Sequence, residues 1–222
     1  MNRQLVIYGS LIYQTLFYLI KTPRIVRKIY RKSLWQGSKG SKILYLTFDD
    51  GPHPVITGQV LDMLRSFEAK ASFFCIGDNV SKYPDMYQRI QSEGHAIGNH
   101  TFHHLNGWKT ADEKYIQNVE KAAQVIDSHL FRPPYGKIRY SQKRKLMKGK
   151  LNMKIVMWTI LSGDFDKNIS PEQCCRYVIR DSGPGSIIVF HDSEKAQDRM
   201  LYALPRVLEH FSKLGYRFER LN

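Results

Sequence analysis

From residue 43 onward, short apolar runs alternate with longer segments in which apolar residues recur at helical spacing. The short runs are rich in β-branched and aromatic residues, a composition that predicts buried strands. The expected strands are Ile43–Phe48, Ala71–Ile76, His95–Asn99, Leu130–Arg132, Lys154–Thr159, Ser186–Phe190 and Tyr216–Glu219. The expected helices are Val55–Glu68, Pro84–Glu93, Ala111–Ser128, Tyr140–Lys148, Pro171–Asp181 and Arg199–Leu214.

This alternation predicts an α/β fold in which parallel strands are joined by right-handed helical crossovers. Polar residues follow most of the strands, all along the series. An open sheet concentrates its site at one switch point, whereas a barrel collects residues from many strand ends. We therefore expect an incomplete (β/α) barrel with about seven parallel strands.

The first 41 residues have a different pattern and are expected to form a separate segment, with a catalytic domain over residues 42–222. Residues 4–20 are apolar and uncharged, and a basic stretch follows over residues 21–32. The apolar run is slightly short for a membrane span of about 20 residues, and no small-residue cleavage site follows it. It is expected either to span a membrane, to lie at its surface, or to pack on the domain. The localisation therefore stays open between membrane-associated and cytoplasmic, and the basic flank favours a cytoplasmic domain if the run spans.

Composition is ordinary for a globular protein, with 42% hydrophobic and 24% charged residues, but the net charge is +14. Nine basic residues and no acidic residue precede Asp49, which leaves +5 for the remainder. The basic excess therefore lies outside the expected site. It favours contact of residues 4–32 with an anionic membrane surface over binding to nucleic acid. The three cysteines have neither disulfide nor zinc-binding spacing, and the oligomeric state stays undetermined.

A metal site is the first chemistry that the strand-end residues predict. His100 and His104 are four residues apart, so one helical turn would point both imidazoles the same way. With the carboxylate of Asp50 they form a set of three ligands, which is typical of a catalytic zinc site. Two surface histidines are the alternative for such a pair taken alone.

The neighbouring Asp49 and Asp50 divide two roles between them. Consecutive residues at a strand end point to different sides, so Asp50 can bind metal while Asp49 acts as a general base toward water. The following Gly51-Pro52 pair predicts a tight turn beside the strand end. A turn without catalytic function is the alternative reading of this short stretch.

The remaining polar strand ends complete a hydrolytic set. His191 can protonate a leaving group, and Asp164 can orient its imidazole. Arg132 can hold either Asp49 or Asp164 in its ionised form, and backbone N–H groups near Tyr135 can stabilise an oxyanion. Each residue taken alone could instead be a polar residue in a loop. Together they predict metal-assisted hydrolysis of an amide or ester.

Five motifs in this order resemble those of the NodB-homology polysaccharide deacetylases, carbohydrate esterase family 4. The matching segments are Thr47–Pro52, His100–His104, Arg132–Tyr135, Asp164–Phe165 and Val189–His191, and the resemblance extends from about Lys42 to the end of the chain. It implies a deformed (β/α) barrel that removes N-acetyl groups from chitin-like oligomers or peptidoglycan. It also implies one divalent metal, Zn²⁺ or alternatively Co²⁺, Ni²⁺ or Fe²⁺.

The resemblance implies one role for each matching residue. These are Asp49 as base, Asp50, His100 and His104 as metal ligands, Arg132 against the base, Tyr135 at the oxyanion, and His191 as acid. Phe165 and Val189 replace a tryptophan and a leucine that line the family's acetyl pocket. Trp108 is expected at the substrate pocket as well.

The two replacements leave other functions open. An O-acetyl esterase, a deacylase of a lipid-linked saccharide, and a silent barrel that only binds glycans are the alternatives. The silent barrel is disfavoured because every predicted catalytic position is occupied by a suitable residue.

Overall fold

The structure is a computed structural model that describes residues 19–38 and 40–222. Eight strands of the described residues belong to one curled sheet with the order β5-β4-β3-β2-β1-β7-β6, and β8 pairs with β1. The strands are β1 Ile43–Asp49, β2 Ala71–Cys75, β3 Ala96–Asn99, β4 Leu130–Phe131, β5 Lys154–Ile155, β6 Ile160–Leu161, β7 Ile187–His191 and β8 Arg217–Phe218. All of these strands pair in parallel.

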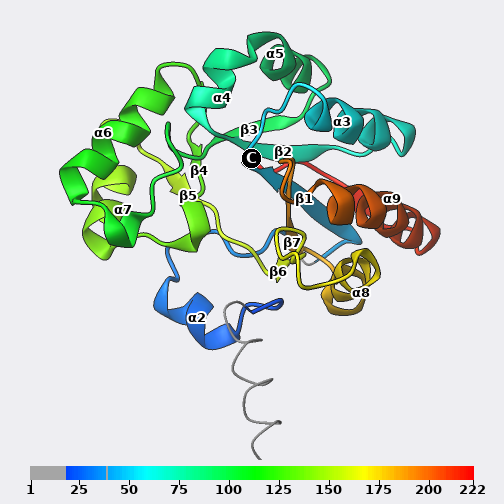
Figure 1. Ribbon diagram of the computed structural model, residues 1–222. Helices are drawn as coiled ribbons and strands as arrows, with labels where there is room; N and C mark the ends of the chain where they lie inside the picture. Colours follow the sequence, from blue (N-terminus) through cyan, green and yellow to red (C-terminus); the bar gives the residue numbers. More distant parts are fainter. Residues whose placement is uncertain (1–18, 39) are drawn as a thin grey trace, which may run out of the picture.

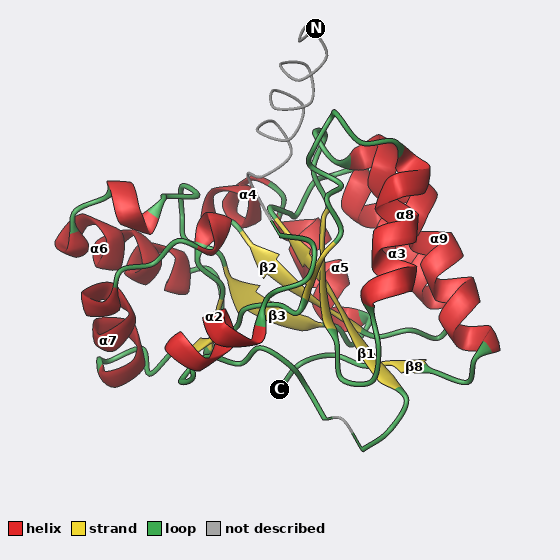
Figure 2. Cartoon of the chain, turned by 90° about the horizontal axis from the view of Figure 1, so that it is seen from below, coloured by secondary structure: helices red, strands yellow, loops and turns green. Residues whose placement is uncertain are grey.

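Helices surround the sheet (Figure 1), which confirms the predicted alternation of strands and helices. They are α2 Arg24–Ile29, α3 Ile56–Ser66, α4 Gly77–Lys82, α5 Pro84–Ser92, α6 Asp112–Ala123, α7 Tyr140–Lys148, α8 Pro171–Asp181 and α9 Gln197–Lys213, with short 3₁₀ turns at Gly107–Lys109 and Pro134–Gly136. Figure 2 shows α6 and α7 on one side of the sheet and α3, α8 and α9 on the other. The sequence pattern did not predict α2 or α4, which are only six residues long.

The core lies between the sheet and these helices. Strand β1 is central and pairs with β2 and β7, and its Phe48 ring stacks on Phe73 and Phe190 with centroids 5.0 and 6.1 Å apart. All three rings are almost fully buried. A continuous apolar sheet of this kind holds the strand ends rigidly, so the polar residues that follow them have fixed positions.

The predicted strand Lys154–Thr159 is wrong as a single element, because the chain changes partners within it. Val156 N–H donates to Phe131 O beside β4, whereas Thr159 N–H donates to Ile187 O beside β7. These two partners lie at opposite edges of the sheet. The segment between β5 and β6 therefore crosses the opening of the incomplete barrel.

Residues 20–37, which we call the strap, bond to both edges of this opening. Isolated bridges join Lys21 to Ile160, Leu34 to Val156 and Gln36 to Ser186. Trp35 is only 8% exposed and belongs to the apolar cluster beneath α6 and α7. Residues 1–18 of the predicted N-terminal segment lie outside the described residues, and the domain boundary at residue 42 stays a prediction. In the part of the chain that the structure describes, every helix is too short or too polar to cross a membrane.

Candidate active site

The candidate residues lie at the carboxyl ends of neighbouring strands. Asp49 ends β1 and is in register with His191, the last residue of β7. Asn99 ends β3 beside β4, and Arg132 directly follows β4. Since the strands are parallel, their carboxyl ends open on one face of the barrel, which we call the catalytic face.

Three potential metal ligands converge on this face. One ligand atom each from Asp50, His100 and His104 lies within 4.8 Å of the others. Oδ1 of Asp50 is 3.1 Å from Nε2 of His104 and 3.7 Å from Nε2 of His100. Oδ1 is buried and takes no hydrogen bond of normal geometry from the described residues. A buried carboxylate oxygen without a donor calls for a cation.

The tautomer of His100 supports the same reading. Its Nδ1 lies 2.8 Å from the carbonyl oxygen of Arg132, which can only accept a hydrogen bond, so Nδ1 carries the proton. Burial lowers the pKa of His100 to about 4, so the ring is neutral and its Nε2 lone pair faces Asp50. The lone pair of His100 Nε2 and a lone pair of Asp50 Oδ1 face one another, and such an arrangement fits a bound divalent metal such as zinc.

His104 is held by Tyr135. The hydroxyl of Tyr135 lies 3.1 Å from Nδ1 of His104, and the two rings meet edge to face with centroids 4.6 Å apart. Tyr135 has a left-handed backbone, with φ of 60°, in the turn after β4. This hydroxyl contact joins residues 31 positions apart, so the sequence pattern did not reveal it.

The two histidines do not meet through a helical turn, and that expectation is wrong. Residues 100–104 form an irregular loop in which Thr101 and His104 have left-handed φ values of 65° and 53°. Side chains hold this loop in place by accepting hydrogen bonds from its backbone N–H groups. Asn99 accepts from Thr101, and Asn118 of α6 accepts from Phe102 and His103 at 2.9 and 3.0 Å.

Asp49 is paired with the fully buried Arg132. Nη1 of Arg132 donates to Oδ1 of Asp49 at 2.7 Å and to Oγ1 of Thr47 at 2.7 Å. The guanidinium carbon lies 4.0 Å from the ring centroid of Phe74. The sequence allowed either Asp49 or Asp164 as the partner of Arg132, and in the structure the partner is Asp49. The hydrogen bond from this buried guanidinium fixes the position of the Asp49 carboxylate.

His191 is paired with Asp164. Nδ1 of His191 lies 2.7 Å from Oδ1 of Asp164, whose Oδ2 accepts the backbone N–H of His191 at 2.7 Å. Burial lowers the pKa of His191, but the charge and hydrogen bond of the fully buried Asp164 outweigh this and raise it to about 10. His191 is therefore a proton donor at neutral pH. Arg199 of α9, which the sequence analysis missed, donates to the carbonyl of Asp164 at 2.6 Å.

Asp192 supports the turn after β1. It accepts the N–H of Gly51 at 3.1 Å and the hydroxyl of Thr57 at 2.5 Å. A Cβ atom on Gly51 would lie 2.0 Å from Oδ2 of Asp192, so glycine is required there by this close approach. Asp50 has φ of 82°, and its carbonyl accepts from Nδ2 of Asn79 at 2.7 Å. Asn79 lies in α4, which the sequence pattern did not predict.

The expected pocket residues occupy different depths. Phe165 meets His191 edge to face with centroids 5.4 Å apart, and Val189 is buried two residues before His191 on the same side of β7. Trp108 is 53% exposed, on the loop between β3 and α6. Trp108 thus lies at the rim, whereas Phe165 lies against the candidate acid.

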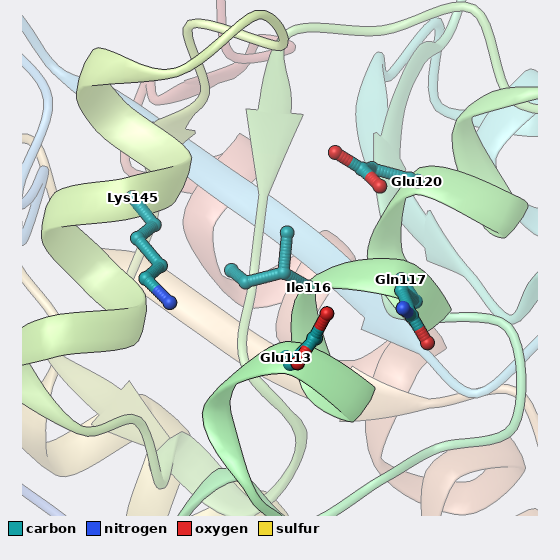
Figure 3. A pocket seen from close by; sticks show the side chains of 5 residues that line it. All are labelled: Glu113, Ile116, Gln117, Glu120 and Lys145. Atoms are coloured by element: carbon teal, nitrogen blue, oxygen red, sulfur yellow. The ribbon is translucent and has the colours of Figure 1, made fainter.

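A separate cavity of about 440 Å³ lies between α6 and α7, away from this face (Figure 3). Its lining residues are Glu113, Ile116, Gln117, Glu120 and Lys145. None of the candidate residues belongs to this lining. The cavity is therefore not part of the site.

Known deacetylases resemble this chain over most of its length. Residues 36–156 match the family model described as polysaccharide deacetylase. A peptidoglycan-N-acetylglucosamine deacetylase of Bacillus cereus is 33% identical over 190 residues, which cover 83% of this chain and 88% of that protein. A chitooligosaccharide deacetylase of Azorhizobium caulinodans is 35% identical over 159 residues, which cover 67% of this chain and 73% of that protein.

Solved structures show the same fold. The crystal structure of a peptidoglycan N-acetylglucosamine deacetylase superposes with a TM-score of 0.81 at 30% identity, covering 90% of this chain and 95% of that chain. A family 4 carbohydrate esterase from Streptomyces lividans, solved with acetate, gives a TM-score of 0.74 at 25% identity, covering 82% of this chain and 94% of that chain. These likenesses confirm the predicted incomplete barrel.

Proposed function

This chain belongs to the polysaccharide deacetylase family, and from that premise we propose that it hydrolyses N-acetyl groups of N-acetylglucosamine-containing glycans, such as chitin-like oligomers or peptidoglycan. One observation carries the proposal. The Asp50, His100 and His104 cluster shares the catalytic face with two hydrogen-bonded pairs, Asp49 with Arg132 and His191 with Asp164. An acid and a base on the same face as a metal-binding cluster are the groups that amide hydrolysis needs.

Asp50, His100 and His104 would hold a divalent metal, for which zinc fits the mixed nitrogen and oxygen ligands. When bound, the metal would polarise the acetyl carbonyl and lower the pKa of water. Asp49 takes the proton of the attacking water, and Arg132 fixes the position of its carboxylate. Backbone N–H of Tyr135 would donate to the developing oxyanion.

His191 completes the reaction by donating its proton to the leaving amine nitrogen. Asp164 holds the imidazolium in place and keeps it protonated near neutral pH. Phe165 supplies an apolar wall beside His191, where the acetyl methyl group can lie away from water. The apolar and basic N-terminal segment, residues 4–32, is proposed to contact a membrane surface.

The test is acetate release from N-acetylglucosamine oligomers by the purified full chain. Release is expected to stop after chelation and to return with zinc. His100→Ala should lose both bound zinc and release, because it removes a ligand that is 2% exposed and central to the cluster. Release that persists after complete chelation, or a folded, zinc-loaded protein without release, would contradict the proposal.

A further inference from the structure

The strap indicates where the N-terminal segment leaves the domain. Residues 20–22 run antiparallel to β6, since Thr22 N–H donates to Thr159 O at 2.9 Å and Leu161 N–H donates to Ile20 O at 2.8 Å. Beyond Leu161, β6 leads directly to Asp164. The chain traced backward from Thr22 therefore advances toward the catalytic face. Ile20, the last residue of the uncharged run 4–20, therefore lies on the side of the catalytic face.

Exposed apolar side chains gather on the same face. Of the described large hydrophobic residues that are strongly exposed, most lie on loops or helix starts that follow strand carboxyl ends. Val55 is 59% exposed after β1, and Trp108 is 53% exposed after β3. Tyr135 and Tyr140 are 60% and 79% exposed after β4, and Leu19, at the end of the strap segment, is 53% exposed.

Basic side chains are interspersed with these residues. Lys137 lies 5.4 Å from the ring centroid of Trp108, and the guanidinium of Arg139 donates to the carbonyl of Trp108. On the opposite rim, exposed Lys195 lies 5.7 Å from the ring of Phe165. Acidic residues lie among them as well: Glu194 is 3.5 Å from His53, and Asp112 is 3.5 Å from Arg139. Amphipathic aromatics with lysine and arginine are typical of the membrane–water interface.

We propose that the catalytic face rests on a phospholipid surface, with Trp108, Tyr135 and Tyr140 at headgroup depth. This orientation rests on the proposed function for its substrate class. It presents the site to acetylated saccharides that are carried on a lipid at the same surface. Both the direction of the strap and the placement of the exposed aromatics support it.

Tryptophan quenching by brominated lipid tests the orientation. Of the three tryptophans, Trp108 is exposed, Trp158 is half-buried and Trp35 is buried, so Trp108 is the one most open to contact with added lipid. The full chain is mixed with vesicles of phosphatidylcholine and phosphatidylglycerol whose acyl chains carry bromine. Emission should be quenched relative to unbrominated vesicles, and Trp108→Phe should lose most of this quenching while still floating with the vesicles.

A matched control moves the exposed tryptophan to the opposite face. Leu214 is 49% exposed after α9, next to the amino ends of the strands. In a chain with Trp108→Phe and Leu214→Trp, brominated vesicles should not quench the new tryptophan. Quenching of this reporter, or no quenching of Trp108, would overturn the proposal, as would failure of the full chain to bind the vesicles.

Acetate release from soluble oligomers, measured on the same preparations, separates the two proposals. Release without quenching would overturn the orientation and leave the deacetylase function intact. Quenching without release would support the orientation and overturn the deacetylase function. A change in Trp108 emission caused by soluble oligomers in a protein that lipid does not quench would assign the aromatic rim to glycan stacking instead.

Discussion

The buried pair formed by Asp49 and Arg132 defines the chemistry at the scale of single residues. Arg132 is fully buried, and its guanidinium donates hydrogen bonds to Asp49, Thr47 and two main-chain carbonyls. The carboxylate of Asp49 is therefore held in one position, as a general base requires.

Asp49→Asn is expected to retain zinc and to lower kcat by roughly 100- to 10,000-fold. The amide keeps the shape of the side chain but cannot take a proton, and Asp49 is not among the three clustered ligands. Zinc content of the purified variant and acetate release at saturating substrate provide the two measurements. Activity close to that of the unsubstituted chain would contradict the assignment of Asp49 as base.

Asp164→Asn is expected to move the alkaline limb of the kcat/KM profile to lower pH. Asp164 raises the pKa of His191 to about 10, and an acid is lost as the pH rises through its pKa. Removal of the charge lowers that pKa, so activity should decline at a lower pH than in the unsubstituted chain. Asp164→Glu, which restores the charge, serves as the control. An unchanged alkaline limb would show that His191 does not act as the acid.

Sequence reasoning succeeds at the residue scale where chemistry follows directly after a strand. Asp49, Asp50, His100 and His191 all stand within one residue of a strand end, so parallel pairing alone brings them together. Asn79, Asn118 and Arg199 could not be found in this way. Each of them binds a backbone group far away in the sequence, and only the folded loops reveal those partners.

The shapes and limits of loops and strands also depend on contacts between residues far apart in the sequence. The loop after β3 takes its shape from Asn118 on α6 rather than from local helical preference. The split of the predicted strand Lys154–Thr159 has a similar origin, since its two ends pair with opposite sheet edges. Hydrophobic pattern records burial, and both halves of that segment are buried, so the pattern could not distinguish one strand from two.

Asn118→Ala is expected to weaken zinc binding by roughly 10- to 100-fold, as removal of supporting residues around metal ligands does. The substitution leaves the N–H groups of Phe102 and His103 without their acceptor, so the loop that carries His100 and His104 loosens. Asn118→Asp keeps an acceptor oxygen and should bind zinc nearly as tightly as the unsubstituted chain. Competition with a chromophoric chelator measures the affinities, and equal affinities for all three proteins would refute the support role.

The strap is the second element with a measurable contribution. Trp35→Ala is expected to lower the free energy of unfolding by about 3–5 kcal/mol, because it removes a large buried side chain from the apolar cluster. Ile25→Ala, on the same segment but at a position 68% exposed, should change it by only about 0.5 kcal/mol or less. Denaturant unfolding compares the two. Equal effects would mean that the strap does not stabilise the barrel.

At the scale of the whole molecule, metal binding and folding are coupled. The three ligands come from the residue after β1 and from the loop after β3, so the complete set exists only in the folded chain. A ligand that binds only the folded state stabilises it by mass action, by about 2.7 kcal/mol at a concentration 100 times Kd.

Zinc at such an excess is expected to raise Tm by roughly 5–10 °C, since a domain of this size gains about 2–4 °C per kcal/mol. Calorimetry of the chelated and the zinc-loaded chain measures this shift. Asp50→Asn removes one ligand and should abolish most of it. A zinc-dependent shift of the same size in Asp50→Asn would place the metal elsewhere.

The strap also determines when the fold can be completed during synthesis. Its partners at Val156, Thr159 and Ser186 are translated long after it. About 150 residues separate Gln36 from Ser186, and ribosomes add roughly 5–20 residues per second, so the strap waits roughly 8 to 30 s for its last partner. During this time the barrel that receives the strap does not yet exist. The strap can therefore reach its final place only after most of the chain has been made.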